Sequence, residues 1–181
     1  MSRIGKNNMD KVVRALEAAG RRVIDTEEVA SPRLIRRFDA AKAALAARNA
    51  GQRVHTRRLY HGTSPEAARL IAVDGFRIDR TSSARTGAFG AGINLTPDVA
   101  HTLLYTRGRA TACIVVCDVA ISRMHVNVSR NPDDGRAITS VPDHVHPKPG
   151  FDAMYGAGGK IVVVPCSARV LPRWLIFHEG Q

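Results

Sequence analysis

The chain is organised around one stretch, Gly87-Ala88-Phe89-Gly90-Ala91-Gly92-Ile93-Asn94-Leu95-Thr96-Pro97. Its first six residues include three glycines, which allow a backbone to come close to another group before it turns. Residues 93–95 lean apolar, and Thr96-Pro97 then predicts the start of a helix. This composition is more typical of the wall of a binding site than of a core strand.

A second stretch lies upstream, Leu59-Tyr60-His61-Gly62-Thr63-Ser64. His61 stands at the end of an apolar-leaning strand, where a side chain can project into a cleft. Gly62 leaves the neighbouring backbone N–H and C=O groups open to a ligand, and two hydroxyl residues follow. The alternative interpretation is a strand-end histidine that is hydrogen-bonded and has no function. The glycine beside it favours the binding interpretation.

Bulk properties indicate a single soluble domain. The chain has 181 residues, of which 44% are hydrophobic and 24% charged, and its formal net charge is +11. No run of apolar residues is long enough to span a bilayer, and residues 1–10 lack the apolar segment of a signal peptide. Its three cysteines lie in apolar runs, which favours reduced thiols over disulfides. We therefore expect a cytoplasmic monomer that does not contact a membrane, with delivery into another cell left open.

Local signals predict most of the helices and strands. Ser31-Pro32 and Ser64-Pro65 each combine an N-cap residue with a proline at the first helical position. A short helical pattern in residues 1–22 stops at Gly20, and a further helix opens at Thr96. Expected strands are 23–25, 58–61, 111–122, 160–164 and 173–177, with 76–78 extended and 123–150 rich in loops. Expected buried faces are Val12, Val13, Leu16 and Ala19; Leu34, Phe38, Ala41 and Leu45; Leu70 and Ile71; Val99, Leu103 and Leu104.

In order and spacing, the sequence resembles the catalytic domain of the poly(ADP-ribose) polymerases, the diphtheria-toxin-like branch of ADP-ribosyltransferases. It is most similar to the mono-ADP-ribosylating members. Besides the two stretches above, the resemblance rests on Val23-Ile24, Pro32-Arg33-Leu34, Gly75-Phe76-Arg77-Ile78, Pro149-Gly150-Phe151-Asp152, Ile161-Val162-Val163-Val164 and Leu171-Pro172-Arg173-Trp174-Leu175-Ile176. It implies an α+β fold in which two small, mainly antiparallel sheets form a split NAD-binding cleft with helices around it.

The same resemblance divides the chain into an accessory segment, residues 1–22, and an ADP-ribosyltransferase catalytic domain, residues 23–181. The region from 79 to 88 matches the family loop that flanks the adenosine half of the dinucleotide. Phe151-Asp152 matches an element that shapes the pocket floor. Periodicity alone predicts only a mixture of helices and strands.

The resemblance implies transfer of ADP-ribose from NAD, the co-substrate, to an acceptor with release of nicotinamide. His61 matches the histidine that hydrogen-bonds the nicotinamide ribose, and Gly62 matches the residue whose backbone clamps the carboxamide. Thr63 is the adjacent hydroxyl residue. The remaining NAD-binding positions are Thr102, a hydroxyl on the carboxamide; Tyr105, stacked on the nicotinamide ring; and Arg77, near the adenine ribose.

Thr102 and Tyr105 are three residues apart, so both are expected on one side of a helix. A stacked aromatic ring together with a hydroxyl suits an amide-bearing ring. The alternative for Tyr105 is a core aromatic residue.

Two catalytic positions depart from the family pattern. Asn94 stands where the family has a tyrosine that stacks on the other face of nicotinamide. Ile161 stands where chain-elongating polymerases have a glutamate that orients a ribose hydroxyl and helps to activate the acceptor. An aliphatic side chain cannot polarise a hydroxyl, which argues against chain synthesis. The catalytic candidates are therefore His61, Asn94 and Ile161, and the two departures favour mono-transfer, in which the acceptor supplies its own carboxylate, or no transfer.

Three functions therefore remain open. The first is an NAD-dependent mono-ADP-ribosyltransferase that acts on a protein or nucleic-acid macromolecule. The second is an inactive module that binds NAD or ADP-ribose, which Asn94 and Ile161 suggest. The third is a nucleic-acid-directed member or a relative of the RNA 2′-phosphotransferases, suggested by the +11 charge. Solvated arginines on helix faces are the favoured explanation of that charge, because no known nucleic-acid motif accompanies them.

A metal site is the weakest alternative. Asp143, His144 and His146, with His125, could be imagined as ligands. The alternation of residues gives no well-spaced third ligand for a tetrahedral ion, so we expect no metal. The sequence also lacks a phosphate loop, a catalytic triad and a carboxylate pair.

Overall fold

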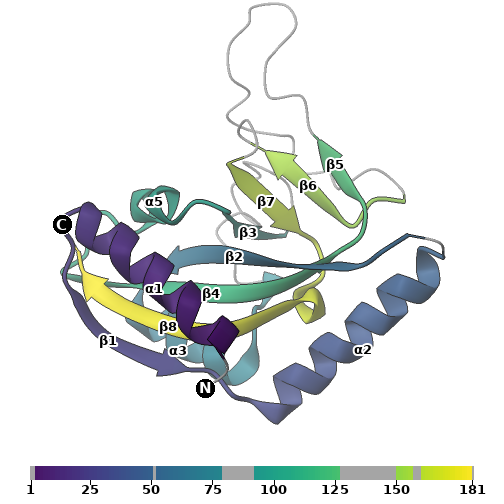
Figure 1. The fold of residues 1–181 in the computed structure, drawn as a ribbon, viewed down its shortest axis with the longest axis horizontal. Helices are drawn as coiled ribbons and strands as arrows, with labels where there is room; N and C mark the ends of the chain where they lie inside the picture. The colour runs from purple at the N-terminus through teal and green to yellow at the C-terminus, as the bar shows by residue number, and fades with distance from the viewer. Residues whose placement is uncertain (1–2, 51, 79–91, 127–149, 157–159, 181) are drawn as a thin grey trace, which may run out of the picture.

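The computed structural model describes residues 3–50, 52–78, 92–126, 150–156 and 160–180. Two four-stranded sheets carry the fold, and helices lie around them (Figure 1). Across the first sheet the strands are β1 (Val23–Glu28), β8 (Val170–Glu179), β4 (Thr111–Ile121) and β2 (His55–Thr63). Across the second they are β3 (Ile93–Leu95), β7 (Ile161–Val164), β6 (Ala153–Gly156) and β5 (Met124–Val126).

All neighbouring strands are antiparallel except β5 and β6, which are parallel. The expected α+β fold with two small, mainly antiparallel sheets is confirmed. The strand predictions for 160–164 and 173–177 are also confirmed, as β7 and the middle of β8. The short strands β5 and β6 were missed, because a few residues are too short for a pattern to be visible.

Strand β4 lies inside the first sheet, as its long apolar run predicted. Its side chains alternate between two buried faces. Cys113 and Val115 belong to the core shared with the second sheet and α3 (Pro65–Asp74). Ile114 and Val116 face the opposite side, where α1 (Arg3–Ala18) covers the sheet. Figure 1 shows α1 in front of the sheet and α3 behind it.

Helix α1 is packed into this second core. Val12 and Leu16 are fully buried and contact the cluster that includes Tyr60 and Trp174. The other two residues expected on its buried face are not buried: Val13 is half-buried and Ala19 is exposed. The division into segments 1–22 and 23–181 stays a prediction, but the helix of the first segment shares its core with the first sheet.

Helix α2 (Pro32–Arg48) follows its sequence signals closely. The Ser31 hydroxyl accepts a hydrogen bond from the Leu34 backbone N–H at 3.4 Å, and Pro32 occupies the first helical turn. Leu34, Phe38 and Leu45 are buried against the first sheet, as predicted.

Helix α3 is capped in the same way but presents a different face from the one predicted. Ser64 accepts from the Ala67 backbone N–H at 3.3 Å, and Gly75 ends the helix with φ at +79°. Ile71 packs against the core, whereas Leu70 is 55% exposed. The prediction that Leu70 is buried was wrong. Adjacent residues of a helix point in different directions, so of these two residues only Ile71 faces the sheet.

The helix expected from Thr96 begins later and is short. It comprises α5 (Val99–Thr102) and a 3₁₀ turn, η2 (Leu103–Tyr105). Asp98 caps it by accepting from the Ala100 backbone N–H at 2.9 Å, because Thr96 is engaged in a β-bridge. Val99 is buried, but Leu104 is exposed rather than on the same side. None of the described helices is long and apolar enough to cross a membrane.

Candidate active site

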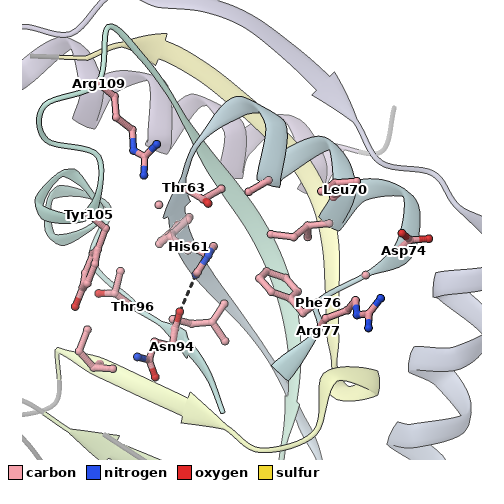
Figure 2. A pocket seen from close by; sticks show the side chains of 17 residues that line it. His61, Thr63, Leu70, Asp74, Phe76, Arg77, Asn94, Thr96, Tyr105 and Arg109 are labelled. Atoms are coloured by element: carbon pink, nitrogen blue, oxygen red, sulfur yellow. Dashed lines mark hydrogen bonds between the residues drawn. The ribbon is translucent and has the colours of Figure 1, made fainter. Parts of the chain in front are cut away.

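The two sheets meet at their edge strands, and the candidate site lies at this junction. An isolated bridge joins Tyr60 of β2 to Thr96 beside β3. The Tyr60 N–H donates to the Thr96 carbonyl at 2.8 Å, and the Thr96 N–H donates to the Tyr60 carbonyl at 2.9 Å. Next to this bridge is a cavity of about 380 Å³, a volume within the range of small-molecule sites. Its walls come from β2, α3, β3, η2 and β7 (Figure 2).

His61 spans the junction between the sheets. Its Nδ1 atom lies 2.9 Å from the carbonyl oxygen of Asn94. A carbonyl can only accept, so Nδ1 carries the proton. Burial lowers the pKa of the imidazole, and the hydrogen bond to Asn94 raises it by a smaller amount. The ring is therefore neutral at pH 7, and Nε2 is left as a hydrogen-bond acceptor. The edge-to-face contact with Phe76, at 5.2 Å between centroids, holds the ring in place.

Gly62 follows His61 and lies under α5. A Cβ atom at this position would come within 2.6 Å of the backbone carbonyl oxygen of Thr102. The glycine is thus needed for the close approach of β2 and α5, in addition to any role toward a ligand. Thr63 continues the pocket wall (Figure 2). His61, Gly62 and Thr63 are consecutive in β2 and all line the pocket, and their roles toward NAD stay a prediction.

Tyr105 and Thr102 do not share a side. Tyr105 lines the pocket and is 48% exposed, so it is not a core residue. Thr102 is fully buried outside the pocket wall, and its hydroxyl donates to the Val99 carbonyl at 2.5 Å. The expectation of a common face was wrong, because α5 ends at Thr102 and packs its backbone on Gly62. In this arrangement the Thr102 hydroxyl does not reach the pocket.

Asn94 and Ile161 both line the pocket, on the side of the second sheet. The two strands that carry them are paired, with Asn94 opposite Val163. The Oδ1 atom of Asn94 is buried and accepts no hydrogen bond from the described residues. A buried acceptor without a donor is costly unless a ligand or water supplies one. Ile161 is 2% exposed and presents only carbon.

Two arginines line the pocket on different sides. Arg77 follows α3 and lines the pocket, and residues 75–77 form no regular structure. Its position near the adenine ribose, which the resemblance implies, stays a prediction. Arg109 precedes β4 and was missed by sequence reasoning. Figure 2 shows the two guanidinium groups well apart, with that of Arg109 on the Thr63 side of the cavity. No motif surrounds Arg109, so no signal in the sequence could have found it.

Some predicted elements lie elsewhere. Phe151-Asp152 does not form the pocket floor. The buried Asp152 carboxylate accepts from the N–H groups of Ser122 at 3.2 Å and Arg123 at 2.7 Å, and pairs with Arg48. It therefore fastens the end of α2 to the turn before β5. The loop from 79 to 88, the glycines at 87 and 90, and the metal candidates Asp143, His144 and His146 lie outside the described residues; His125 is in β5.

A family model for the poly(ADP-ribose) polymerase catalytic domain matches residues 5–151. The match covers most of the chain, and the chain belongs to this family. It supports NAD-dependent ADP-ribosyltransferase activity, since these catalytic domains use NAD as a co-substrate. It does not distinguish members that add one unit from members that build chains. No curated protein shows significant similarity to the chain.

The pocket walls suit parts of NAD. The neutral His61 imidazole and the unpaired Asn94 Oδ1 are acceptors of the kind that ribose hydroxyls require. Tyr105 offers a partly exposed ring on which a planar base can stack. Arg77 and Arg109 supply positive charge toward an anionic dinucleotide. The residues present therefore fit the co-substrate of the family.

Proposed function

We propose that this chain is an NAD-dependent mono-ADP-ribosyltransferase that modifies a protein or nucleic-acid acceptor and releases nicotinamide. The observation that carries the proposal is the apolar side chain of Ile161 in the pocket wall. Ile161 lies in the pocket wall and is 2% exposed, at the position where chain-elongating relatives need a carboxylate.

Each wall residue has a stated role in this proposal. Nε2 of His61 accepts a hydrogen bond from the nicotinamide ribose, and the Gly62 backbone holds the carboxamide. Tyr105 stacks on the nicotinamide ring, and Arg77 lies on the side of the adenine ribose. When bound, NAD supplies the glycosidic bond that is broken. The contribution of the protein is to hold the nicotinamide and the ribose on either side of that bond in a fixed geometry, and to exclude other orientations of the two groups.

The charges of the pocket favour single transfer. Chain growth requires a base that prepares a ribose hydroxyl on the growing polymer for attack. Among the described residues that line the pocket, Asp74 is the only acid. Its carboxylate is 3.6 Å from the Arg33 guanidinium, at the end of α3, and Figure 2 shows it on the far side from Tyr105. An acceptor that is already anionic needs no such base, so a first transfer remains possible.

The same departures also favour a second candidate, an inactive NAD- or ADP-ribose-binding module. With Asn94 in place of the stacking tyrosine, the ring is covered on one face instead of two. With Ile161, no side chain orients the acceptor. The pocket and the neutral histidine would then serve binding only.

The length of the product decides between these functions. Purified protein is incubated with labelled NAD and with candidate acceptors: the protein itself, acidic peptides, RNA and DNA. Single ADP-ribose additions on one acceptor class, resolved by mass, support mono-transfer and identify the acceptor. Chain growth would contradict the role assigned to Ile161. Absence of label, with nicotinamide still bound by calorimetry, would establish the binding module.

A further inference from the structure

The Thr102 hydroxyl, which was expected at the end of the pocket near Gly62 and Thr63, does not reach the pocket. In the proposed function, the substituent at position 3 of the pyridine ring lies at this end. Thr102 was expected to donate to it, but its hydroxyl is committed to the Val99 carbonyl and is buried. Beside the Gly62 backbone, the place that Thr102 was expected to take is therefore open to another donor. Arg109 lines the same cavity as Gly62 and Thr63, and it lies shortly before Cys113, the β4 residue that pairs with Thr63. Figure 2 draws its guanidinium on the Thr63 side of the cavity.

Arg109 is held by the end of the first sheet. The Gly180 N–H donates to the Ala110 carbonyl at 3.0 Å, and Thr111 pairs with Glu179 at the start of β4. A Cβ atom on Gly180 would lie 1.5 Å from the Arg109 carbonyl oxygen, so the two backbones are in direct contact. The backbone of Arg109 is thus fixed by its neighbours although its side chain is exposed.

The charge of Arg109 is not neutralised by a close partner. Within 4.0 Å of its guanidinium there is no carboxylate among the described residues. The acid that senses it is Glu66 in the first turn of α3, outside the pocket wall. The pKa of Glu66 is lowered first by its own backbone N–H and by the Ser64 hydroxyl, and only in smaller part by Arg109. This end of the pocket is therefore cationic.

We propose that Arg109 recognises the 3-substituent of the pyridine ring, and that the pocket therefore accepts a pyridine-3-carboxylate at least as well as the carboxamide. The ligands are nicotinic acid and the dinucleotide that carries it. The proposal rests on the proposed function, which places the ring between Gly62 and Tyr105. A guanidinium donates two parallel hydrogen bonds to a carboxylate and is also attracted by its negative charge, whereas a carboxamide offers only one acceptor oxygen.

The test compares nicotinamide with nicotinic acid by calorimetric titration. Wild type, Arg109→Gln and Arg109→Lys are measured, with Arg107→Gln as the matched control. Arg107 is an exposed arginine of the same turn that does not line the pocket. We expect wild type to bind nicotinic acid at least as tightly as nicotinamide. Arg109→Gln should lower the affinity for nicotinic acid about tenfold and the affinity for nicotinamide less than about threefold, as expected for loss of one charge-assisted contact.

The remaining outcomes separate the two proposals. Arg109→Lys should retain part of the affinity for nicotinic acid, because the positive charge remains while the two parallel donors of the guanidinium are lost. Arg107→Gln should change the affinity for neither ligand. If nicotinamide binds and Arg109→Gln leaves the ratio of the two affinities unchanged, the role of Arg109 is overturned and the proposed function still stands. Binding of neither ligand to wild type would overturn both, because the pyridine site would then be misplaced.

Discussion

The Nδ1 atom of His61 lies 2.9 Å from the carbonyl oxygen of Asn94. This hydrogen bond crosses from the edge of the first sheet to the edge of the second, beside the Tyr60–Thr96 bridge. It fixes the tautomer of the histidine and directs its free nitrogen away from Asn94. Because the acceptor is a backbone atom, the orientation of His61 depends on the position of β3 and not on the side chain at position 94.

Tyr105 is expected to provide the stacking surface for nicotinamide. Tyr105→Ala should weaken nicotinamide binding by about 1–3 kcal/mol, which is the range for losing an aromatic stack and its buried area. Tyr105→Phe keeps the ring and serves as the control, with binding close to wild type. The measurement is calorimetric titration of nicotinamide. Equal affinity of wild type and Tyr105→Ala would show that the ring binds elsewhere.

Gly62 is expected to be intolerant of a side chain for a structural reason. In Gly62→Ala the added methyl group meets the Thr102 carbonyl oxygen, so β2 and α5 must move apart. We expect a loss of about 1–3 kcal/mol in the free energy of unfolding, the usual cost of overpacking, and weaker nicotinamide binding as η2 moves.

The matched control for this prediction is Gly108→Ala. Gly108 has φ at +72°, so the variant bears backbone strain, but its added Cβ meets no atom within 4 Å. It should cost about 1–2 kcal/mol of stability without changing nicotinamide binding. Urea unfolding measures the stability of both variants. A Gly62→Ala protein as stable as wild type would contradict the packing of α5 on β2.

The helix of residues 1–22 should be required for stability. Leu16→Ala removes a fully buried side chain between α1 and the first sheet and should lower the free energy of unfolding by about 2–5 kcal/mol. Leu104→Ala, at an exposed position, is the control and should cost little. If Leu16→Ala is as stable as wild type, α1 is an independent accessory segment and the division at residue 22 gains support.

Acidification should destabilise the fold through His178. Its side chain is fully buried in β8. Burial lowers its pKa from 6.5, the Glu179 carbonyl raises it, and Arg21 lowers it further. The unfolded chain therefore binds the proton more readily than the folded one. The stability contributed by neutral His178 is complete above about pH 6.5 and is lost as the pH falls through the folded pKa.

The size of this effect is limited by one proton. It contributes at most about 1.4 kcal/mol per pH unit to the free energy of unfolding. Urea unfolding of wild type and of His178→Gln between pH 7 and pH 5 gives the two slopes. We expect a shallower slope for the variant, with His61 supplying part of what remains, since burial also lowers its pKa. Parallel slopes would exclude His178 as a source.

Local signals predicted the parts of the fold that are determined locally. The Ser31-Pro32 and Ser64-Pro65 caps depend on a few adjacent atoms, and both are present. The apolar run of β4 predicted a central strand because burial on both faces leaves a continuous pattern. The start of α5 was predicted at Thr96, but Asp98 caps the helix, because Thr96 forms a bridge with the distant Tyr60.

The site was predicted only in part for the same reason. His61 and Gly62 lie near the end of β2, whose register with β4 is fixed, and Tyr105 ends the 3₁₀ turn that contacts β2. Thr102 was misassigned, because its environment depends on how α5 packs on Gly62. Arg109 had no local signal at all, since its place in the pocket is set by contact with Gly180, far away in the chain.

Release of nicotinamide from labelled NAD tests the central claim most directly. Wild type and His61→Ala are incubated with NAD in parallel, free nicotinamide is followed by chromatography, and circular dichroism verifies that the variant is folded. We expect release by wild type and none by a folded His61→Ala protein. Equal release by both would remove His61 from the mechanism, and a wild type that binds NAD without releasing nicotinamide would show that the fold serves binding alone.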